Sequence, residues 1–414
     1  MIRILESNQA STLLERRKTR LEEAEKTVKP ILEAVRKKGD KALVQYAKKL
    51  DGLTRSSVVV PADELRAAEH QLSPDFRSAV KTAANNIRGY AKLQVPKPFR
   101  KALAPGIRLG QIVRPLDAVA AYVPSGRYPL PSTLMMTVIP AQAAGVTNVF
   151  VASPRPTTEI YGTASMLDVT TVFQMGGAHA IAAFAFGTKS VPKVDRIVGP
   201  GNAYVTAAKK LLAGEVGIDF VAGPTEVVII AADGDPRWIA ADMLAQAEHD
   251  VDAAAILFTP SRKLASAVAM EVEKQLADLS TAKVARKSID KNSAIIITNS
   301  LDQAVEMSNQ FAPEHLSIPE LRLLDQVKHA GTVFVGGNSP EAAGDYAAGP
   351  SHVLPTNGAA RLRGGLSAAD FVKVIAVQEL NGEALRRLSP VITTLARAEG
   401  LEAHARSVEV RLAK

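Results

Sequence analysis

The sequence predicts an α/β protein built from two doubly wound parallel-sheet domains of incomplete Rossmann-like type, with small helical segments at the N- and C-terminal ends. Three observations support this fold class. Short β-rich runs alternate with helices of small residues across the middle of the chain, and glycines mark the turns between them. Hydrophobic residues make up 47% of the 414 residues, enough for two or three cores. Repeated strand–turn–helix units place parallel strands in one sheet with helices on its faces.

The first hundred residues are expected to be helical. Residues 10–50 have the spacing of an amphipathic helix, in which Val35 and Leu43 suit a packed face. A second helical region follows Pro61, and three prolines between residues 96 and 105 end helical structure.

From residue 117 onward, strands and helices are expected to alternate. The expected strands are Val119–Val123, Val146–Ala152, Thr170–Gln174, Arg196–Val198, Glu226–Ala232, Ala253–Phe258, Ala294–Ile297 and Thr332–Val335. Helices are expected at Leu134–Gly145 and Ala178–Phe186, from Asn202, from Pro236 and up to Leu276, and the tail after Leu366 is expected to be helical. The predicted segments are a helical one at 1–21, a first α/β domain at 22–121 plus 226–365, a second α/β domain at 122–225 and a helical one at 366–414.

Composition excludes several classes of protein. The net charge of +8 comes from basic clusters interleaved with acidic residues, and aromatic residues are only 5%, so we expect no nucleic-acid partner. No apolar leader or membrane-length run is visible, which indicates a cytoplasmic protein with no membrane partner. The chain has no cysteine, so thiolate zinc sites and cysteine nucleophiles are impossible and any metal must be bound mainly by nitrogen and oxygen.

The helix that starts at Asp235-Pro236 ends in polar residues. Gln246 lies on the same face as Met243, and His249 follows one helical turn after Gln246. An amide oxygen and an imidazole side by side can hold a hard or borderline divalent cation. For an isolated motif of this length, a solvent-exposed polar helix end is the commoner explanation.

Two glycine turns stand where strands meet helices, at Gly176-Gly177 and at Gly199-Pro200-Gly201. Ligands bind at such turns in doubly wound folds, and helix amino ends favour phosphate. Neither turn has the dinucleotide-binding pattern of three spaced glycines, so glycines that only form tight βα turns are the better explanation of this signal by itself.

Three further stretches pair a carboxylate with a histidine, and each could serve acid/base chemistry or be structural. They are Glu314-His315, Asp345 with His352, and Glu399 with His404.

Taken in order, these stretches resemble the histidinol dehydrogenase family over nearly the whole chain, from about Lys18 to Leu412. The motifs that carry the resemblance are Val198-Gly-Pro-Gly-Asn-Ala-Tyr-Val205, Gly217-Ile-Asp, Ala222-Gly-Pro-Thr-Glu226, Gln246-Ala-Glu-His-Asp250, Ala312-Pro-Glu-His-Leu316, Gly344-Asp-Tyr, His352-Val-Leu-Pro355 and Glu399-Gly-Leu-Glu-Ala-His404.

The resemblance implies an NAD-dependent oxidation of L-histidinol through L-histidinal to L-histidine, the last step of histidine biosynthesis. It implies one Zn²⁺ per subunit, and a homodimer because the last zinc ligand comes from the partner subunit; segment 366–414 would then dimerise. The implied zinc ligands are Gln246, His249, Asp345 and His404. Glu314 would activate water and His315 would carry protons. The implied cofactor-binding residues are Tyr122, His179 and Asn202. The implied substrate-binding residues are Thr225, His315, His352 and Glu399, together with the zinc ligands.

The chain departs from the family pattern in three places. His179 stands where the family usually has glutamine, and Thr225 stands where serine is more usual. The usual Pro-Gly-Gly turn is Pro124-Ser125-Gly126 here, and Arg127 follows it. A related branch that oxidises sulfopropanediol carries an arginine and a threonine in comparable places, and arginine suits a sulfonate. Glu399 and Asp345 fit a cationic imidazole-amine better. The alternatives are therefore a paralogous dehydrogenase of another polar alcohol, a metal-dependent hydrolase, and a catalytically silent binding protein.

Overall fold

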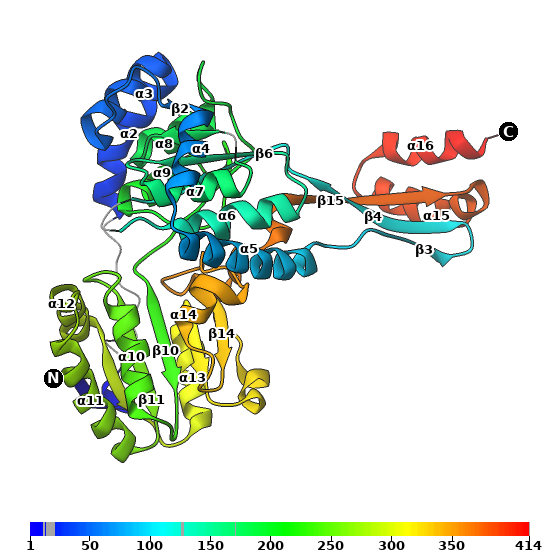
Figure 1. Ribbon diagram of the computed structural model, residues 1–414. Helices are drawn as coiled ribbons and strands as arrows, with labels where there is room; N and C mark the ends of the chain where they lie inside the picture. Colours follow the sequence, from blue (N-terminus) through cyan, green and yellow to red (C-terminus); the bar gives the residue numbers. More distant parts are fainter. Residues whose placement is uncertain (11–12, 14–20, 126–127, 170, 414) are drawn as a thin grey trace. The chain divides into compact units, whose positions relative to one another are not determined.

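The computed structural model describes residues 1–10, 13, 21–125, 128–169 and 171–413, and it divides into two compact units (Figure 1). Unit 1 comprises Met1–Gln94 and Asp117–Phe371, and unit 2 comprises Val95–Leu116 and Val372–Lys414. Parts of the predicted helix at 10–50, and Gly126 with Arg127, lie outside the described residues.

The first sheet of unit 1 has six strands in the order β1-β12-β11-β10-β13-β14, and every pairing in it is parallel. Its strands are β1 (Arg3–Glu6), β10 (Glu226–Ile230), β11 (Ala254–Thr259), β12 (Ala294–Ile297), β13 (His315–Ile318) and β14 (Thr332–Val335). The helices that connect them are α10 (Pro236–Ala247), α11 (Arg262–Ala277), α12 (Ala282–Asn292) and α13 (Leu301–Phe311), with a 3₁₀ turn η3 (Leu321–Gln326).

Alternate side chains of β10 enter different cores. Val227 and Ile229 pack in the cluster that contains α10 and α11, while Val228 and Ile230 pack in the cluster that contains α13. Because successive side chains of a strand point to opposite faces, the sheet is buried on both sides by helices. This is the doubly wound arrangement that the alternating pattern predicted.

The second sheet of unit 1 also has six strands, in the order β2-β7-β6-β5-β8-β9. They are β2 (Val59–Val60), β5 (Ala118–Tyr122), β6 (Asn148–Ser153), β7 (Val172–Gln174), β8 (Arg196–Val198) and β9 (Gly217–Ile218), and β2 alone is antiparallel to its neighbour. Among the described residues, unit 1 also contains α2 (Leu21–Lys38), α3 (Asp40–Tyr46), the π-helix η2 (Ala47–Asp51), α4 (Ala62–Gln71), α5 (Pro74–Gln94), α6 (Pro131–Ala143), α7 (Thr158–Met166), α8 (Gly177–Phe186), α9 (Ala203–Leu212), α14 (Glu341–Ala343) and the π-helix η4 (Gly344–Ala348). Short 3₁₀ turns are η1 (Ser7–Gln9), η5 (Ala359–Arg361) and η6 (Ala368–Phe371).

Unit 2 has a three-stranded antiparallel sheet in the order β15-β4-β3, with two helices beside it (Figure 1). Its elements are β3 (Phe99–Ala104), β4 (Ile107–Pro115), β15 (Val372–Leu380), α15 (Gly382–Ala398) and α16 (Glu402–Leu412). The expectation of a wholly helical tail is therefore wrong, since Val372–Leu380 is a strand. The segment carries a run of apolar and β-branched residues, Val374–Val377, between Lys373 and Gln378, which is typical of a short strand rather than a helix.

Six further strands of the described residues were not predicted, namely β1, β2, β3, β4, β9 and β13. Arg3–Glu6 is a strand that pairs with β12, whereas the first 21 residues were expected to be helical. β13 was not predicted, because His315 and Ser317 interrupt its apolar run, yet it lies between β10 and β14.

Strand Ala118–Tyr122 pairs within the second sheet, although the predicted domain boundary fell at residue 121. The division into independently folding domains stays a prediction. Of the helices in the described residues, none is long and apolar enough to cross a membrane.

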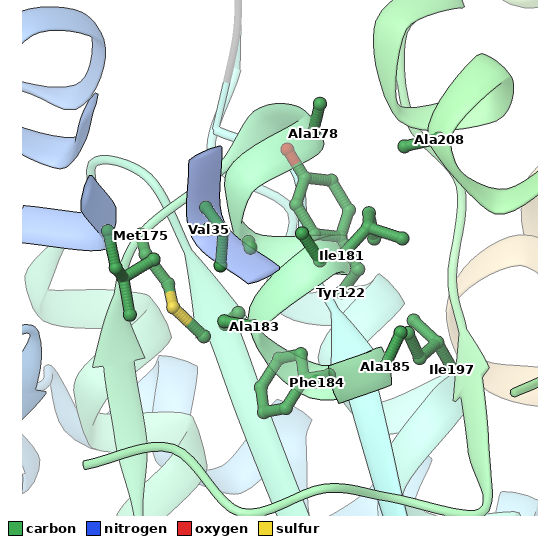
Figure 2. Close-up of a cluster of buried hydrophobic side chains, with 14 of the residues drawn as sticks. Val35, Tyr122, Met175, Ala178, Ile181, Ala183, Phe184, Ala185, Ile197 and Ala208 are labelled. Atoms are coloured by element: carbon green, nitrogen blue, oxygen red, sulfur yellow. The ribbon is translucent and has the colours of Figure 1, made fainter. Parts of the chain in front are cut away.

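A single large cluster of buried side chains fills the space beneath α8, with Ile181, Phe184 and Tyr122 among its members (Figure 2). Phe184 is fully buried, and the edge of its ring meets Phe173 at a centroid distance of 5.6 Å. Edge-to-face aromatic pairs add to the stabilisation that burial alone provides.

We expect Phe184→Ala to lower the free energy of unfolding by about 3–5 kcal/mol, because the cavity cannot collapse fully within a rigid α/β layer. Urea unfolding followed by circular dichroism measures the effect. Met270→Ala on α11 removes a side chain that is 62% exposed and serves as the control, with an expected change within about 0.5 kcal/mol. Equal effects of the two substitutions would contradict the assignment of this core.

Candidate active site

Several of the polar residues singled out in the sequence converge at the amino ends of two neighbouring strands of the first sheet. Thr225 and Glu226 stand at the start of β10, and Glu314 and His315 stand at the start of β13, with Val227 opposite His315 in the ladder. The strand order reverses here, since β11 and β12 lie on the other side of β10. α10 runs back along the sheet, so its last turn returns to the same end of the strands.

Glu314 is held at this end by two hydrogen bonds. Its Oε2 accepts from the hydroxyl of Thr225 at 2.5 Å and from the main-chain N–H of Glu226 at 2.9 Å. The residue is only 6% exposed, and this burial raises the pKa of Glu314 despite the opposing effects of His315 and the two hydrogen bonds. A buried carboxylate with a raised pKa is a candidate general base.

His315 is oriented by the main chain of Glu226. Its Nδ1 lies 3.2 Å from the carbonyl oxygen of Glu226, so Nδ1 carries a proton and donates it, which leaves Nε2 as the basic nitrogen of the neutral ring. Nε2 has no hydrogen-bond partner among the described residues, and Asp345 Oδ1 lies 3.5 Å away. The ring stacks on Phe334 with centroids 6.0 Å apart.

Burial lowers the pKa of His315, but nearby carboxylates outweigh it. Glu341, Glu314 and Asp345 together raise the pKa of His315 to about 10. Three acidic side chains therefore surround one imidazole in a site largely closed to solvent, an excess of negative charge that favours a bound cation.

Gln246 and Glu341 form a buried pair. Gln246 is fully buried, and its amide lies 2.7 Å from Thr225 Oγ1, 2.8 Å from the Glu226 nitrogen and 2.5 Å from Glu341 Oε1. The orientation that matches donors to acceptors directs the amide oxygen to Glu226 N–H and the amide nitrogen to Glu341. Burial is the largest cause of a raised pKa of about 8 for Glu341.

Side chains from the end of α10, from α14 and from η4 form a cluster that could hold a metal ion. Ligand atoms of His249, Glu341 and Asp345 all lie within 4.8 Å of one another. Of the four expected zinc ligands, the structure thus brings His249 and Asp345 together, and it places Gln246 beside Glu341 in the same cluster. Burial opposes ionisation of Asp345, but the neighbouring imidazoles outweigh it and lower its pKa.

The sequence analysis did not select Glu341. A signal was available, because Glu341 precedes Asp345 by four residues, the spacing at which two side chains share a helix face. The structure continues α14 directly into the π-helix η4, so the two carboxylates come from one short helical stretch.

His352 lies close to the cluster, but its own ring is already engaged. Nδ1 lies 2.9 Å from the carbonyl oxygen of Asp345, and Nε2 lies 3.0 Å from the hydroxyl of Thr133 on α6. Burial lowers the pKa of His352, which favours the neutral ring. Its expected contact with substrate stays a prediction.

The expected cofactor-binding residues lie in the second sheet. Tyr122 ends β5, and its hydroxyl accepts from Gly177 N–H at 3.1 Å. Asn202 is exposed at the start of α9, and its Oδ1 caps the helix by accepting from the amides of Tyr204 and Val205, which leaves its NH₂ group to donate. The strand order reverses between β5 and β8, so both residues stand at a switch point, where doubly wound folds bind ligands.

His179 differs from the other two. Its side chain is fully buried, its Nε2 lies 2.7 Å from Asp51 Oδ2, and its ring stacks on Tyr46. In this structure the ring packs against η2 and α3 rather than facing solvent. A contact between His179 and a cofactor remains a prediction.

The last two expected site residues belong to unit 2. Glu399 is the C-cap of α15 and His404 lies in the first turn of α16, and both are exposed. Their role at the metal cluster stays a prediction.

Comparison with known proteins gives one consistent result. Residues 14–412 match the family model described as histidinol dehydrogenase. A histidinol dehydrogenase of Thermus thermophilus is 48% identical over 392 residues, which cover 94% of this chain and 94% of that protein. One from Aquifex aeolicus is 45% identical over 396 residues, covering 94% and 93%. The crystal structure of histidinol dehydrogenase from Elizabethkingia anophelis matches with a TM-score of 0.95 at 35% identity, over 99% of this chain and 98% of that chain.

The carboxyl of Asp242, one helical turn before Gln246 on α10, allows a test of the electrostatics. Burial raises the pKa of Asp242 from 3.8 to about 6. The folded state therefore binds this proton more tightly than the unfolded chain does. Ionisation of Asp242 then lowers the free energy of unfolding of the protein as the pH rises from about 4 through 6.

We expect Asp242→Asn to raise the free energy of unfolding by about 1–2 kcal/mol at pH 8, after allowance for partial exposure, and to leave it unchanged near pH 4. Urea unfolding at both pH values measures the difference. A stabilisation that does not depend on pH would contradict this assignment.

Proposed function

The chain belongs to the histidinol dehydrogenase family, and from this premise we propose that it oxidises L-histidinol through L-histidinal to L-histidine with two molecules of NAD. The observation that carries the proposal is the convergence of Glu314, His315, Asp345 and the Gln246 amide at one end of the first sheet. The relatives named above favour histidinol over the sulfonated diol that the sequence left open.

A zinc ion fits the donors of the cluster. We propose that Gln246, His249 and Asp345 hold it, with His404 as the fourth ligand. The Gln246 amide would then turn so that its oxygen, and not its nitrogen, faces the cluster. All four offer nitrogen or oxygen, the donors left to a chain without cysteine. The surplus of buried carboxylates around His315 also favours a divalent cation. When bound, zinc would supply a template that orients the imidazole and amine of the substrate.

His315 acts as the proton acceptor in this proposal. Its Nδ1–H donates to a main-chain carbonyl, which leaves Nε2 as the nitrogen that exchanges protons. The carboxylates around the ring raise the pKa of His315, and a divalent cation held among them would oppose that effect and favour the neutral ring. Nε2 of the neutral ring then takes the hydroxyl proton of L-histidinol while a hydride leaves for NAD. After that proton has passed to solvent, the same nitrogen takes a proton from the hydrated aldehyde while the second hydride leaves for a second NAD.

Glu314 then activates water. Many aldehyde oxidations pass through a thiohemiacetal, which is impossible without cysteine. Water must therefore add to the aldehyde, and a buried carboxylate with a raised pKa can take the proton that the water loses. Thr225 and the main chain of Glu226 hold Glu314 in place while it does so.

We propose that NAD binds at the switch point of the second sheet, where Tyr122 and the NH₂ group of Asn202 stand. This placement is supported by the helix amino end of α9, which favours phosphate.

We further propose that two chains form a homodimer through unit 2. Unit 2 exposes several large apolar side chains, among them Val374, Val391, Leu395 and Val410, each more than half exposed. Large apolar side chains exposed in this number on one small unit favour its burial in an interface. The occupant is a second copy, because the proposed ligand His404 and Glu399 belong to the same unit.

The direct test is NADH formation with L-histidinol, NAD and zinc. We expect two NADH per L-histidinol, and loss of turnover with a chelator followed by recovery with zinc. Turnover with 2,3-dihydroxypropane-1-sulfonate but not with L-histidinol would transfer the chain to the paralogous branch. Product formation in the absence of NAD would favour a hydrolase.

His315→Asn tests the division of roles. We expect kcat to fall by about 10²–10⁴-fold, because proton transfer is lost, while zinc content measured by atomic emission is unchanged. His404→Ala is the paired variant and should lower zinc occupancy. Loss of zinc in His315→Asn, or full occupancy in His404→Ala, would show that the roles are misassigned.

A further inference from the structure

The turn between β8 and α9 lies against the backbone of Tyr122. Gly199 has a φ of +110°, and a Cβ added there would lie 2.1 Å from the carbonyl oxygen of Tyr122. Only glycine allows both the backbone conformation and this close approach. The position of the turn is therefore tied to the end of β5.

A buried lysine and a buried aspartate each form a hydrogen bond with the main chain of this glycine. Lys209 Nζ donates to the carbonyl oxygen of Gly199 at 2.6 Å, and Asp219 Oδ2 accepts from the Gly199 N–H at 2.8 Å. Lys209 and Asp219 also pair directly, with Nζ and Oδ1 2.5 Å apart. Oδ1 accepts in addition from the Phe220 N–H at 2.7 Å.

The pair is almost closed to solvent. The side chains of Lys209 and Asp219 are 4% and 0% exposed. A buried ion pair of this kind is often no more stabilising than apolar residues of the same size, because desolvation offsets the attraction. What it can provide is a defined geometry, and here both main-chain polar groups of one residue are fixed by it.

The lysine comes from the helix that the turn opens. Lys209 lies on α9, seven residues after Asn202, and Asp219 follows the edge strand β9. These contacts link the Gly199-Pro200-Gly201 turn to α9 and to the end of β9. Asn202 adds a further link by capping α9 through its Oδ1.

We infer that Lys209 and Asp219 are positioning residues for dinucleotide binding, because they preorganise the Gly199-Pro200-Gly201 turn and so aim the NH₂ group of Asn202 and the amino end of α9. This inference rests on the proposed NAD site at the switch point of the second sheet. Neither residue is expected to touch the cofactor. Preorganisation acts by removing the entropy cost of ordering the turn when the ligand binds.

The test compares two variants of the protein. Lys209→Met with Asp219→Asn removes both charges together, so no lone charge is left buried. Lys210→Met is the matched control, since Lys210 is the next residue of α9 and forms an exposed pair with Glu25. The measurements are the Kd for NADH by fluorescence titration, the KM for L-histidinol, and hydrogen exchange of a peptide spanning residues 199–206 without cofactor.

We expect the double variant to weaken NADH binding by about tenfold and to speed exchange in residues 199–206, while the KM for L-histidinol and the zinc content stay within about twofold. The control should match the parent protein in every measurement. Parent-like NADH binding in the double variant would overturn the inference. So would weakened binding without faster local exchange, or weakened binding accompanied by an equal loss of histidinol affinity.

Two further comparisons remove ambiguity. Failure of the parent protein itself to bind NADH would sink the proposed function, which is a different result from an unaffected double variant. Should the double variant fail to fold, Lys209→Arg keeps a cation on the longer, planar guanidinium, which cannot occupy the same position. Parent-like NADH binding and exchange in Lys209→Arg would then overturn the inference.

Discussion

The candidate active site depends on the main chain of one residue, Glu226, at the amino end of β10. Its N–H binds the carboxylate of Glu314, and its carbonyl oxygen binds Nδ1 of His315. These two bonds exist because β10 and β13 are neighbours in a parallel ladder that is buried on both faces. The carboxylate and the imidazole are thus held by backbone groups, which cannot rotate away as side chains can. A strand end in the centre of a sheet is among the most rigid supports a fold offers.

The site also concentrates negative charge where water is scarce. Glu314, Glu341 and Asp345 lie around His315, and burial raises the pKa of two of these three acids. Groups in this situation either take up protons or attract a cation. The ligands proposed for zinc and the groups proposed for proton transfer therefore share one electrostatic environment, and a change in either alters the other.

The second sheet uses its strand ends differently. Its proposed cofactor residues stand at the carboxyl ends of β5 and β8, whereas the acid/base residues of the first sheet stand at the amino ends of β10 and β13. The two places share one device, because in each a single residue has both its N–H and its carbonyl held. Glu226 holds two side chains by its main chain, and the main chain of Gly199 is held by two side chains. In both arrangements, hydrogen bonds to the main chain at a strand end fix the position of a neighbouring loop or side chain.

The sequence by itself determined most of the strands, the doubly wound class and the polar end of α10, because these follow from local spacing of apolar residues and from N-caps. Its ordered motifs also carried the family resemblance. Only the tertiary structure decided that Thr225 meets Glu314, 89 residues away, that Glu341 joins the cluster, and that Lys209 and Asp219 close on Gly199. The physical reason is that periodicity reports which face of an element is buried, whereas contacts between distant residues depend on which strands are neighbours, and that order is set by the packing of the whole sheet.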